Sequence, residues 1–184
     1  MQPEDVLAFW FAGDPTLRRK VWFQKDADFD AACGRFADAA RTARQGAFDA
    51  WADTPCGVLA LVLLLDQFPR NLHRGSAEAF ASDAHARQVA RAAIARGHDQ
   101  GLNPVERMFL YLPFEHAENL ADQDESVRLY EALRAELGDE TVKYATDHRD
   151  VIRRFGRFPH RNAALGRVNT AEEAAYLAQP GAGF

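Results

Sequence analysis

Two short segments of the chain carry polar residues that packing alone does not require. Residues 65–71 read Leu-Asp-Gln-Phe-Pro-Arg-Asn, and residues 155–162 read Phe-Gly-Arg-Phe-Pro-His-Arg-Asn. Both place Phe-Pro ahead of Arg and Asn, and the Arg guanidinium is a planar fork of donors that suits carboxylate or phosphate. The two segments therefore predict a set of ligand-binding residues, namely Asp66, Gln67, Arg70, Asn71, Arg157, His160, Arg161 and Asn162.

A third polar segment, residues 111–118, reads Tyr-Leu-Pro-Phe-Glu-His-Ala-Glu. Its two glutamates are three residues apart, so both can lie on one face of a helix. A histidine beside a carboxylate can move a proton near neutral pH. We therefore expect a catalytic set made of Glu115, His116, Glu118 and His148, with His116 or His148 as the base.

A metal site is the alternative chemistry for these acidic and histidine residues. Di-iron helical proteins use Glu-x-x-His, and zinc proteases use His-Glu-x-x-His. Neither spacing is present around Glu115 and His116, so we predict no metal and no cofactor. His148-Arg149-Asp150 is similar to a kinase catalytic loop, but Phe155 stands where that motif requires Asn.

The charge of the chain is unevenly distributed. Its 22 basic and 27 acidic residues give a net charge of -5, which does not favour nucleic acid as a partner. The stretch from His148 to Arg167 nevertheless holds six arginines and one acid, Asp150. Such a patch can attract an anion. In the alternative interpretation, these arginines pair with acids such as Asp66, Glu115 and Glu118, or close helix ends, and bind no ligand.

The elements that must position these residues are helices. Cap residues, helical spacing and Gly stops predict helices near 3–10, 28–45, 57–67, 82–97, 122–137 and 140–155. They also predict a short helix after residues 14–15, a helix that starts at Asn103 and is kinked or divided by Pro113, and a short last helix that starts at the Thr170 capping box. Residues 57–67 are apolar on all faces, which is typical of a central helix. No stretch shows the alternation of a strand.

These patterns predict one all-α domain over residues 1–179, an array or bundle of about eight or nine helices, followed by a flexible tail at 180–184. Cys33 and Cys56 have no ligand-like spacing, so we expect free thiols in a reducing compartment. The longest apolar run, residues 58–65, is shorter than the roughly 20 residues of a membrane span. We therefore expect a cytoplasmic protein without a membrane partner.

The order of several motifs resembles a known bacterial family. The matching pieces are residues 6–11, 22–23, 65–71, 111–113, 115–116, 118, 123, 155–162 and 165–167. In these pieces the chain is similar to the family named domain of unknown function 924. The resemblance implies an all-helical, tetratricopeptide-like fold and implies no activity. Family members often have Ser where this chain has Ala117 and Asn169, so we expect no serine nucleophile there.

Three interpretations of the polar residues stay open at this point. They could form one pocket in which Arg70, Arg157 and Arg161 hold an anionic small molecule during hydrolysis or group transfer. They could instead belong to a helical scaffold that binds a protein or peptide partner. They could also be purely structural. We favour the first, because buried polar groups are costly unless they are satisfied.

Overall fold

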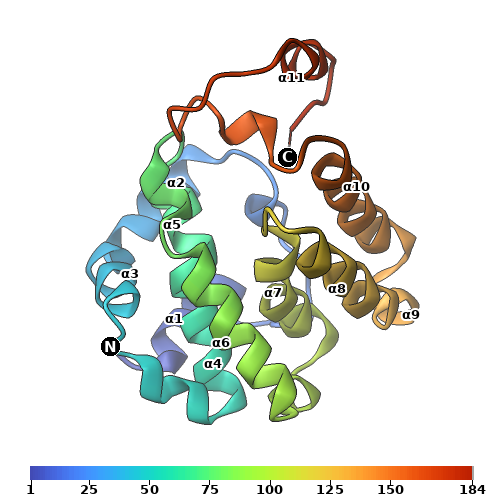
Figure 1. The fold of residues 1–184 in the computed structure, drawn as a ribbon. Helices are drawn as coiled ribbons and strands as arrows, with labels where there is room; N and C mark the ends of the chain where they lie inside the picture. The colour runs from blue at the N-terminus through green and yellow to red at the C-terminus, as the bar shows by residue number, and fades with distance from the viewer. Residues whose placement is uncertain (184) are drawn as a thin grey trace.

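Residues 1–183 are described by a computed structural model, in which helix-start and helix-stop residues divide the chain into the elements of Figure 1. The α-helices are α1 (Pro3–Phe11), α2 (Ala27–Cys33), α3 (Ala37–Arg44), α4 (Pro55–Val62), α5 (Phe68–Leu72), α6 (Asp83–Ala95), α7 (Pro104–Glu115), α8 (Leu120–Glu131), α9 (Arg134–Leu137), α10 (Asp139–Phe155) and α11 (Ala171–Leu177). Short 3₁₀ turns are η1 (Lys20–Trp22), η2 (Gly34–Phe36), η3 (Asp49–Asp53), η5 (Ala77–Phe80), η6 (His98–Gly101) and η7 (Pro159–Arg161), and η4 (Leu63–Gln67) is a π-helix.

The all-α prediction is confirmed, since residues 1–183 contain no strand. Nine of the α-helices have seven or more residues, in agreement with the expected eight or nine, and only α5 and α9 are shorter. The tetratricopeptide-like arrangement stays a prediction. The flexible tail also stays a prediction, because its last residue, Phe184, lies outside the described residues.

Several helix ends lie where the sequence predicts them. The Asn103 side chain accepts from the backbone N–H groups of Val105 and Glu106, while Glu106 accepts from the N–H of Asn103, which completes a capping box at the start of α7. Thr170 and Glu173 form the same reciprocal pair at the start of α11. Gly156 ends α10 in the left-handed conformation, at φ 70°.

Other predicted ends are wrong. The helix expected over 28–45 is interrupted by η2, and the helix expected over 122–137 is interrupted between α8 and α9. Pro113 does not divide α7, which continues to Glu115. Because α7 ends two residues after Pro113, the proline removes a donor only from the last turn.

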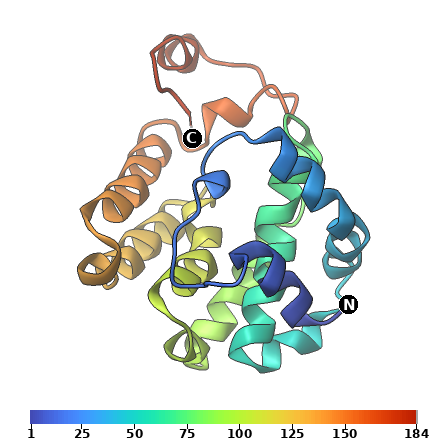
Figure 2. The same ribbon diagram turned by 180° about the vertical axis from the view of Figure 1, so that it is seen from behind.

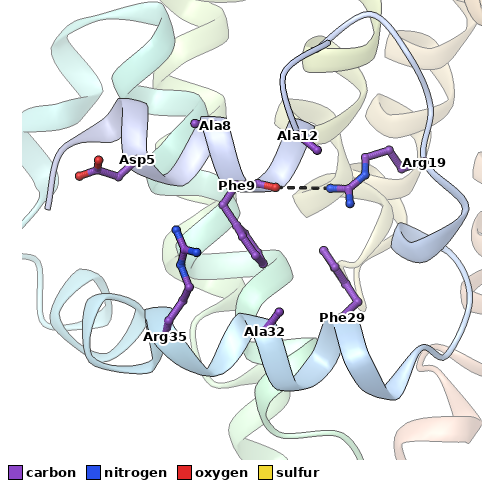
Figure 3. Close-up of a pocket in the computed structure, with 8 residues that line it drawn as sticks. All are labelled: Asp5, Ala8, Phe9, Ala12, Arg19, Phe29, Ala32 and Arg35. Atoms are coloured by element: carbon purple, nitrogen blue, oxygen red, sulfur yellow. Dashed lines mark hydrogen bonds between the residues drawn. The ribbon is translucent and has the colours of Figure 1, made fainter.

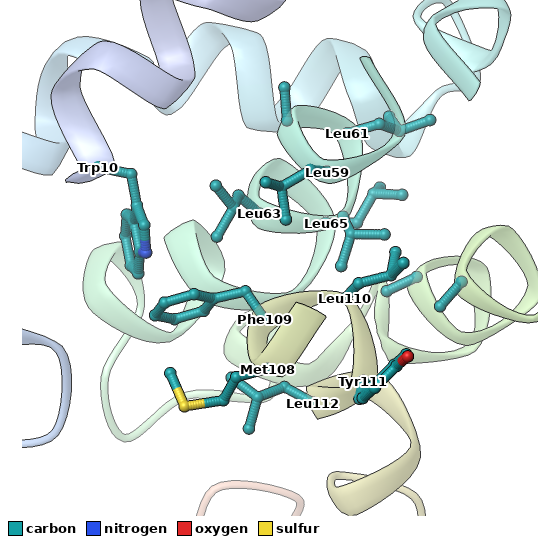
Figure 4. Packing of buried hydrophobic residues seen from close by; sticks show 14 of the residues in the cluster. Trp10, Leu59, Leu61, Leu63, Leu65, Met108, Phe109, Leu110, Tyr111 and Leu112 are labelled. Carbon is teal, nitrogen blue, oxygen red and sulfur yellow. The ribbon is translucent and has the colours of Figure 1, made fainter. Parts of the chain in front are cut away.

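The core is built around the buried stretch that runs from α4 through η4 into α5. Every residue from Gly57 to Pro69 is buried, as predicted for a central helix. Helices α1, α6 and α7 pack against α4. In Figure 4, Trp10 of α1 and Phe109 of α7 lie against the leucines of this stretch. None of the helices within residues 1–183 combines the length and the apolar character needed to cross a membrane.

The second half of the chain adds helices beside this core. Helix α8 packs against α7, α10 packs against α8, and α11 contacts η7 (Figures 1 and 2). The three polar segments of the sequence therefore lie at the end of the α4–η4–α5 stretch, at the end of α7, and at the turn after α10. The contacts described next bring these three places together.

Candidate functional site

The π-helix η4 places the first polar segment in the core. Asp66 is fully buried in η4, directly after three leucines that are also fully buried. The N–H of Phe68 donates to the carbonyl of Leu63 five residues back, which is the π pattern. Single π turns are rare and occur frequently at functional sites.

Side chains satisfy the carbonyls where η4 passes into α5. Pro69 has no N–H, so the carbonyl of Leu65, four residues back, loses its helical donor. The Ser82 hydroxyl donates to that carbonyl at 2.6 Å. Arg70 donates to the carbonyl of Asp66 at 2.6 Å, and Asn71 donates to the carbonyl of Gln67 at 3.0 Å. Ser82 therefore closes this corner rather than capping α6, and the amide of Asn71 serves the backbone.

Asp66 is held by three neighbouring side chains. Its carboxylate lies 2.8 and 3.0 Å from Nδ1 of His116, 2.6 Å from the Gln67 amide nitrogen and 3.2 Å from Arg70. Burial alone would raise the pKa of this carboxyl, but Arg70, His116 and Gln67 overcome that effect and hold its pKa well below the usual range. Asp66 is therefore ionised at neutral pH.

The ionised Asp66 fixes the tautomer of His116. A carboxylate can only accept, so the proton of the neutral imidazole lies on Nδ1 and is donated to Asp66. Burial and the Arg70 charge lower the pKa of His116, although Asp66 opposes them. The ring is therefore neutral at pH 7 with a lone pair on Nε2. Nε2 has no hydrogen-bond partner among residues 1–183, and 13% of the His116 side chain is exposed.

Glu115 and His148 lie near this pair, with 6.5 Å between the ring centres of His116 and His148. Glu115 is buried, and burial together with the negative charge of Asp66 raises its pKa to about 8. Its carboxyl oxygen lies 3.6 Å from Nδ1 of His148, which donates to the carbonyl of Tyr144 at 2.9 Å. Burial lowers the pKa of His148 to about 3. The site thus holds one ionised and one protonated carboxyl group, a pattern of acid and base pairs in enzymes.

The two Phe-Pro corners meet at Asp83, the first residue of α6. Arg70 binds both Asp83 oxygens at 2.9 Å, and Arg161 lies 3.4 Å from one of them. Arg161 is buried and stacks on the rings of Phe158 and Phe80, at 4.4 and 4.7 Å from the ring centres. Its Nε has no hydrogen-bond partner among residues 1–183, and burial together with Arg70 lowers its pKa to about 10. The charge of Arg161 is therefore the least compensated at this site.

Glu118 lies in the same region but serves as a structural link. Both of its oxygens bind Arg167, at 2.7 and 2.8 Å, and one accepts the N–H of Phe158 at 2.8 Å. These bonds hold the pKa of Glu118 low despite its partial burial. With its oxygens occupied, Glu118 connects the end of α7 to the turn after α10.

The hydrogen bonds of Arg157 and Asn162 are made to residues other than Asp66 and His116. Arg157 binds both oxygens of Glu173 at 2.6 and 2.8 Å and donates to the carbonyl of Val168. Asn162 donates to Asn169 at 2.7 Å and also contacts Glu173. These contacts fasten α11 and the loop before it, so the pairing interpretation holds for Arg157.

His160 lies beside Phe158, with 5.4 Å between the ring centres, and burial lowers its pKa to about 4. Gly183 approaches this histidine so closely that a β-carbon there would lie 3.1 Å from the His160 side chain. His160 is thus packed at the edge of the site. Within residues 1–183, no three His, Cys, Asp or Glu side chains gather in a way that could hold a metal ion.

Two further residues join the site together, and sequence reasoning missed one of them, Asp83. Asp83 links both arginines, and Arg167 neutralises Glu118. Asp83 follows a serine at the start of α6, where an acid is ordinary for a helix N-terminus, so nothing in its local sequence indicates a link to Arg161. Arg167 belongs to the arginine-rich stretch 148–167, and its bonds to Glu118 agree with the alternative interpretation in which these arginines pair with acids.

Comparisons with known proteins agree with this architecture. The sequence model of a bacterial protein family of unknown function, DUF924, matches residues 6–181, so the chain belongs to that family. The solved structure of ATU0120, a protein of unknown function from Agrobacterium tumefaciens, is similar at a TM-score of 0.85 and 45% identity over 96% of both chains. None of the curated proteins compared with the chain matches it.

Proposed function

We propose that Asp66, His116 and Arg161 form a site that binds a small anionic substrate and transfers a proton during its hydrolysis or group transfer. The observation that carries this proposal is the hydrogen bond from His116 to the buried carboxylate of Asp66, which leaves Nε2 of a neutral imidazole without a partner in the described part of the chain. Histidines oriented in this way by a carboxylate act as general bases in many unrelated enzymes.

His116 suits this role better than His148. Both rings are neutral at pH 7, but His116 keeps part of its side chain exposed, whereas His148 is more deeply buried and its Nδ1 is bonded to the carbonyl of Tyr144. In the proposed reaction, Nε2 of His116 takes the proton of water or of a substrate hydroxyl as its oxygen attacks.

Glu115 is the proposed acid. Its carboxyl carries a proton at neutral pH because its pKa is raised to about 8. In this scheme the Glu115 proton passes to the leaving oxygen as the bond to that oxygen breaks. Glu115 then takes up a proton from water and His116 releases one, which returns both residues to their starting states. Two carboxyl groups of opposite protonation, Asp66 and Glu115, thus have separate roles.

Arg161 is the proposed anion-binding group. The charges of Arg70 and Arg161 are balanced formally by Asp66 and Asp83, but Arg70 takes both oxygens of Asp83 at the shorter distances. The buried Nε of Arg161 is bonded to none of the residues that the structure describes. An anion that bonds to this guanidinium would supply the missing acceptor and stabilise its charge.

Titration calorimetry with inorganic phosphate and with succinate tests the proposal. We expect the wild-type protein to bind at least one of these anions and Arg161→Gln to lose at least about tenfold in affinity, since charged hydrogen bonds contribute roughly 1.5–3 kcal/mol. Arg157→Gln is the matched control, because Arg157 is paired with Glu173, and it should bind as the wild type does.

Arg161→Lys provides a second variant that keeps the charge if Arg161→Gln unfolds, and it should bind more weakly than the wild type without losing binding. His116→Gln should retain the anion and lose turnover of any substrate found among phosphate and carboxylate esters. Absence of anion binding by the wild type, or equal losses in Arg157→Gln and Arg161→Gln, would refute the proposal.

A further inference from the structure

A hollow lies between α1 and α2, on elements that contribute nothing to the Asp66–His116 site. It has a volume of about 520 Å³ and is lined by Asp5, Ala8, Phe9, Ala12, Arg19, Phe29, Ala32 and Arg35 (Figure 3). We propose that this hollow, here called the α1–α2 groove, binds a small amphipathic monocarboxylate, with its apolar body on Phe9 and its carboxylate on Arg35.

The apolar part of the groove comes from two aromatic rings and three alanines. Phe9 and Phe29 stack nearly parallel, with 5.6 Å between ring centres and 6° between ring planes. Phe29 is buried, while Phe9 is only partly buried and faces the groove. The lining side chains of Ala8, Ala12 and Ala32 are small, so the facing helices leave space beside Phe9. Such a surface favours an aromatic ring or a short alkyl chain.

Arg35 supplies a cation that has no hydrogen-bond or carboxylate partner among the described residues. Its guanidinium lies 5.0 Å from the ring centre of Phe9 and 4.9 Å from that of Phe36, and it is bonded to no residue among 1–183. Nineteen of the 22 basic residues are arginines, and only four of these lack a carboxylate partner within the described chain. Two of the four, Arg19 and Arg35, line this groove.

Arg19 adds to the positive potential on the opposite side of the two rings (Figure 3). Its Nη1 donates to the carbonyl of Trp10 at 2.6 Å and to that of Phe9 at 3.4 Å, near the end of α1. Arg19 therefore has a structural task, whereas all five donors of Arg35 remain available. Arg35 is the better anchor for a carboxylate.

The charge around the groove limits the ligand to one negative charge. Asp5 also lines the groove, where it accepts the N–H of Gln2 at 2.8 Å. Its carboxylate would repel a second charge on the ligand, which disfavours dicarboxylates and phosphate dianions. Complementarity thus points to one carboxylate joined to an apolar body, such as an aromatic or medium-chain acid.

Nitrogen-15 heteronuclear NMR with benzoate and octanoate tests this inference on the full chain. We expect shifts at the amides of Ala8, Ala32 and Arg35, and an affinity for each acid that exceeds that for benzamide or octanamide by about tenfold, because a charge-assisted bond is lost in the amides. Binding of acid and amide with equal affinity, or the absence of shifts at these amides, would overturn the inference.

Two variants and one control make the test specific. Arg35→Gln should weaken benzoate about tenfold, and Ala32→Leu should weaken it by filling the groove. Arg41→Gln is the control, because Arg41 is an exposed arginine of α3 paired with Asp38, and it should bind normally. Arg161→Gln should also leave benzoate binding unchanged, which separates this groove from the proposed catalytic site. Equal binding by Arg35→Gln and wild type would overturn the inference.

Discussion

Glu115→Gln should remove a loss of stability that the wild-type protein suffers as the pH rises. The pKa of the buried Glu115 carboxyl is raised from 4.5 to about 8, mainly by burial and further by Asp66. Between pH 4.5 and about 8, the folded protein therefore keeps a proton on Glu115 that the unfolded chain has released. Stability falls with rising pH wherever the folded state binds more protons. The contribution of Glu115 is thus complete below pH 4.5 and is lost as the pH rises to about 8.

The size of this effect follows from the two pKa values. A pKa moved from 4.5 to about 8 is equivalent to roughly 5 kcal/mol, at about 1.4 kcal/mol for each tenfold change in proton affinity. Glutamine has nearly the same shape and no charge to lose. The variant should therefore resemble the wild type near pH 5 and exceed it in stability by several kcal/mol near pH 8.

Urea denaturation followed by tryptophan fluorescence at about pH 5, 6, 7 and 8 measures this difference. The buried His148 and the half-buried His160, whose pKa values are lowered, contribute a loss of stability as the pH falls below about 6.5. Both proteins contain these histidines. The difference in unfolding free energy between wild type and Glu115→Gln therefore reports on Glu115 alone. Glu125→Gln, at a glutamate paired with Arg128, is the control. Parallel pH profiles for wild type and Glu115→Gln would refute this reasoning.

Two further predictions concern the links that hold the site. Ser82→Ala leaves the buried carbonyl of Leu65 without its donor and should cost about 1–3 kcal/mol in urea denaturation, whereas Ser76→Ala, at an exposed serine, should cost little. Glu118→Ala removes the acceptor of Arg167 and of the Phe158 N–H, so amide hydrogen exchange at Phe158 should become faster. Exchange in α4 should stay the same and is the control. An unchanged exchange rate at Phe158 would contradict the link.

Helix positions were predictable because their signals are local. The capping boxes at Asn103 and Thr170 and the stop at Gly156 are each fixed by residues within one or two turns, and the structure has them where expected. The break at η2 and the π-helix η4 were not predicted. The π turn depends on how the buried leucines and Asp66 pack against other helices, which a single segment does not specify.

The sequence indicated which residues to consider for the candidate site, but it did not indicate which of them form ion pairs with one another. Its arginines and acids were identified by type and spacing, but an ion pair depends on which side chains meet in space. Arg157 binds Glu173, whose place in a capping box gave no indication of that contact. Likewise, the two Phe-Pro corners meet through Asp83, which lies between them in the sequence and has no motif of its own.

The protonation of His116 tests the central claim most directly. Nitrogen-15 NMR of the histidine rings, with His116→Gln to assign the signal, reports which ring nitrogen carries the proton. The account predicts a neutral ring at pH 7, protonated at Nδ1 toward Asp66, with a free Nε2 whose signal moves when phosphate or succinate is added. A ring that is protonated at Nε2, or that does not respond to either anion, would contradict it.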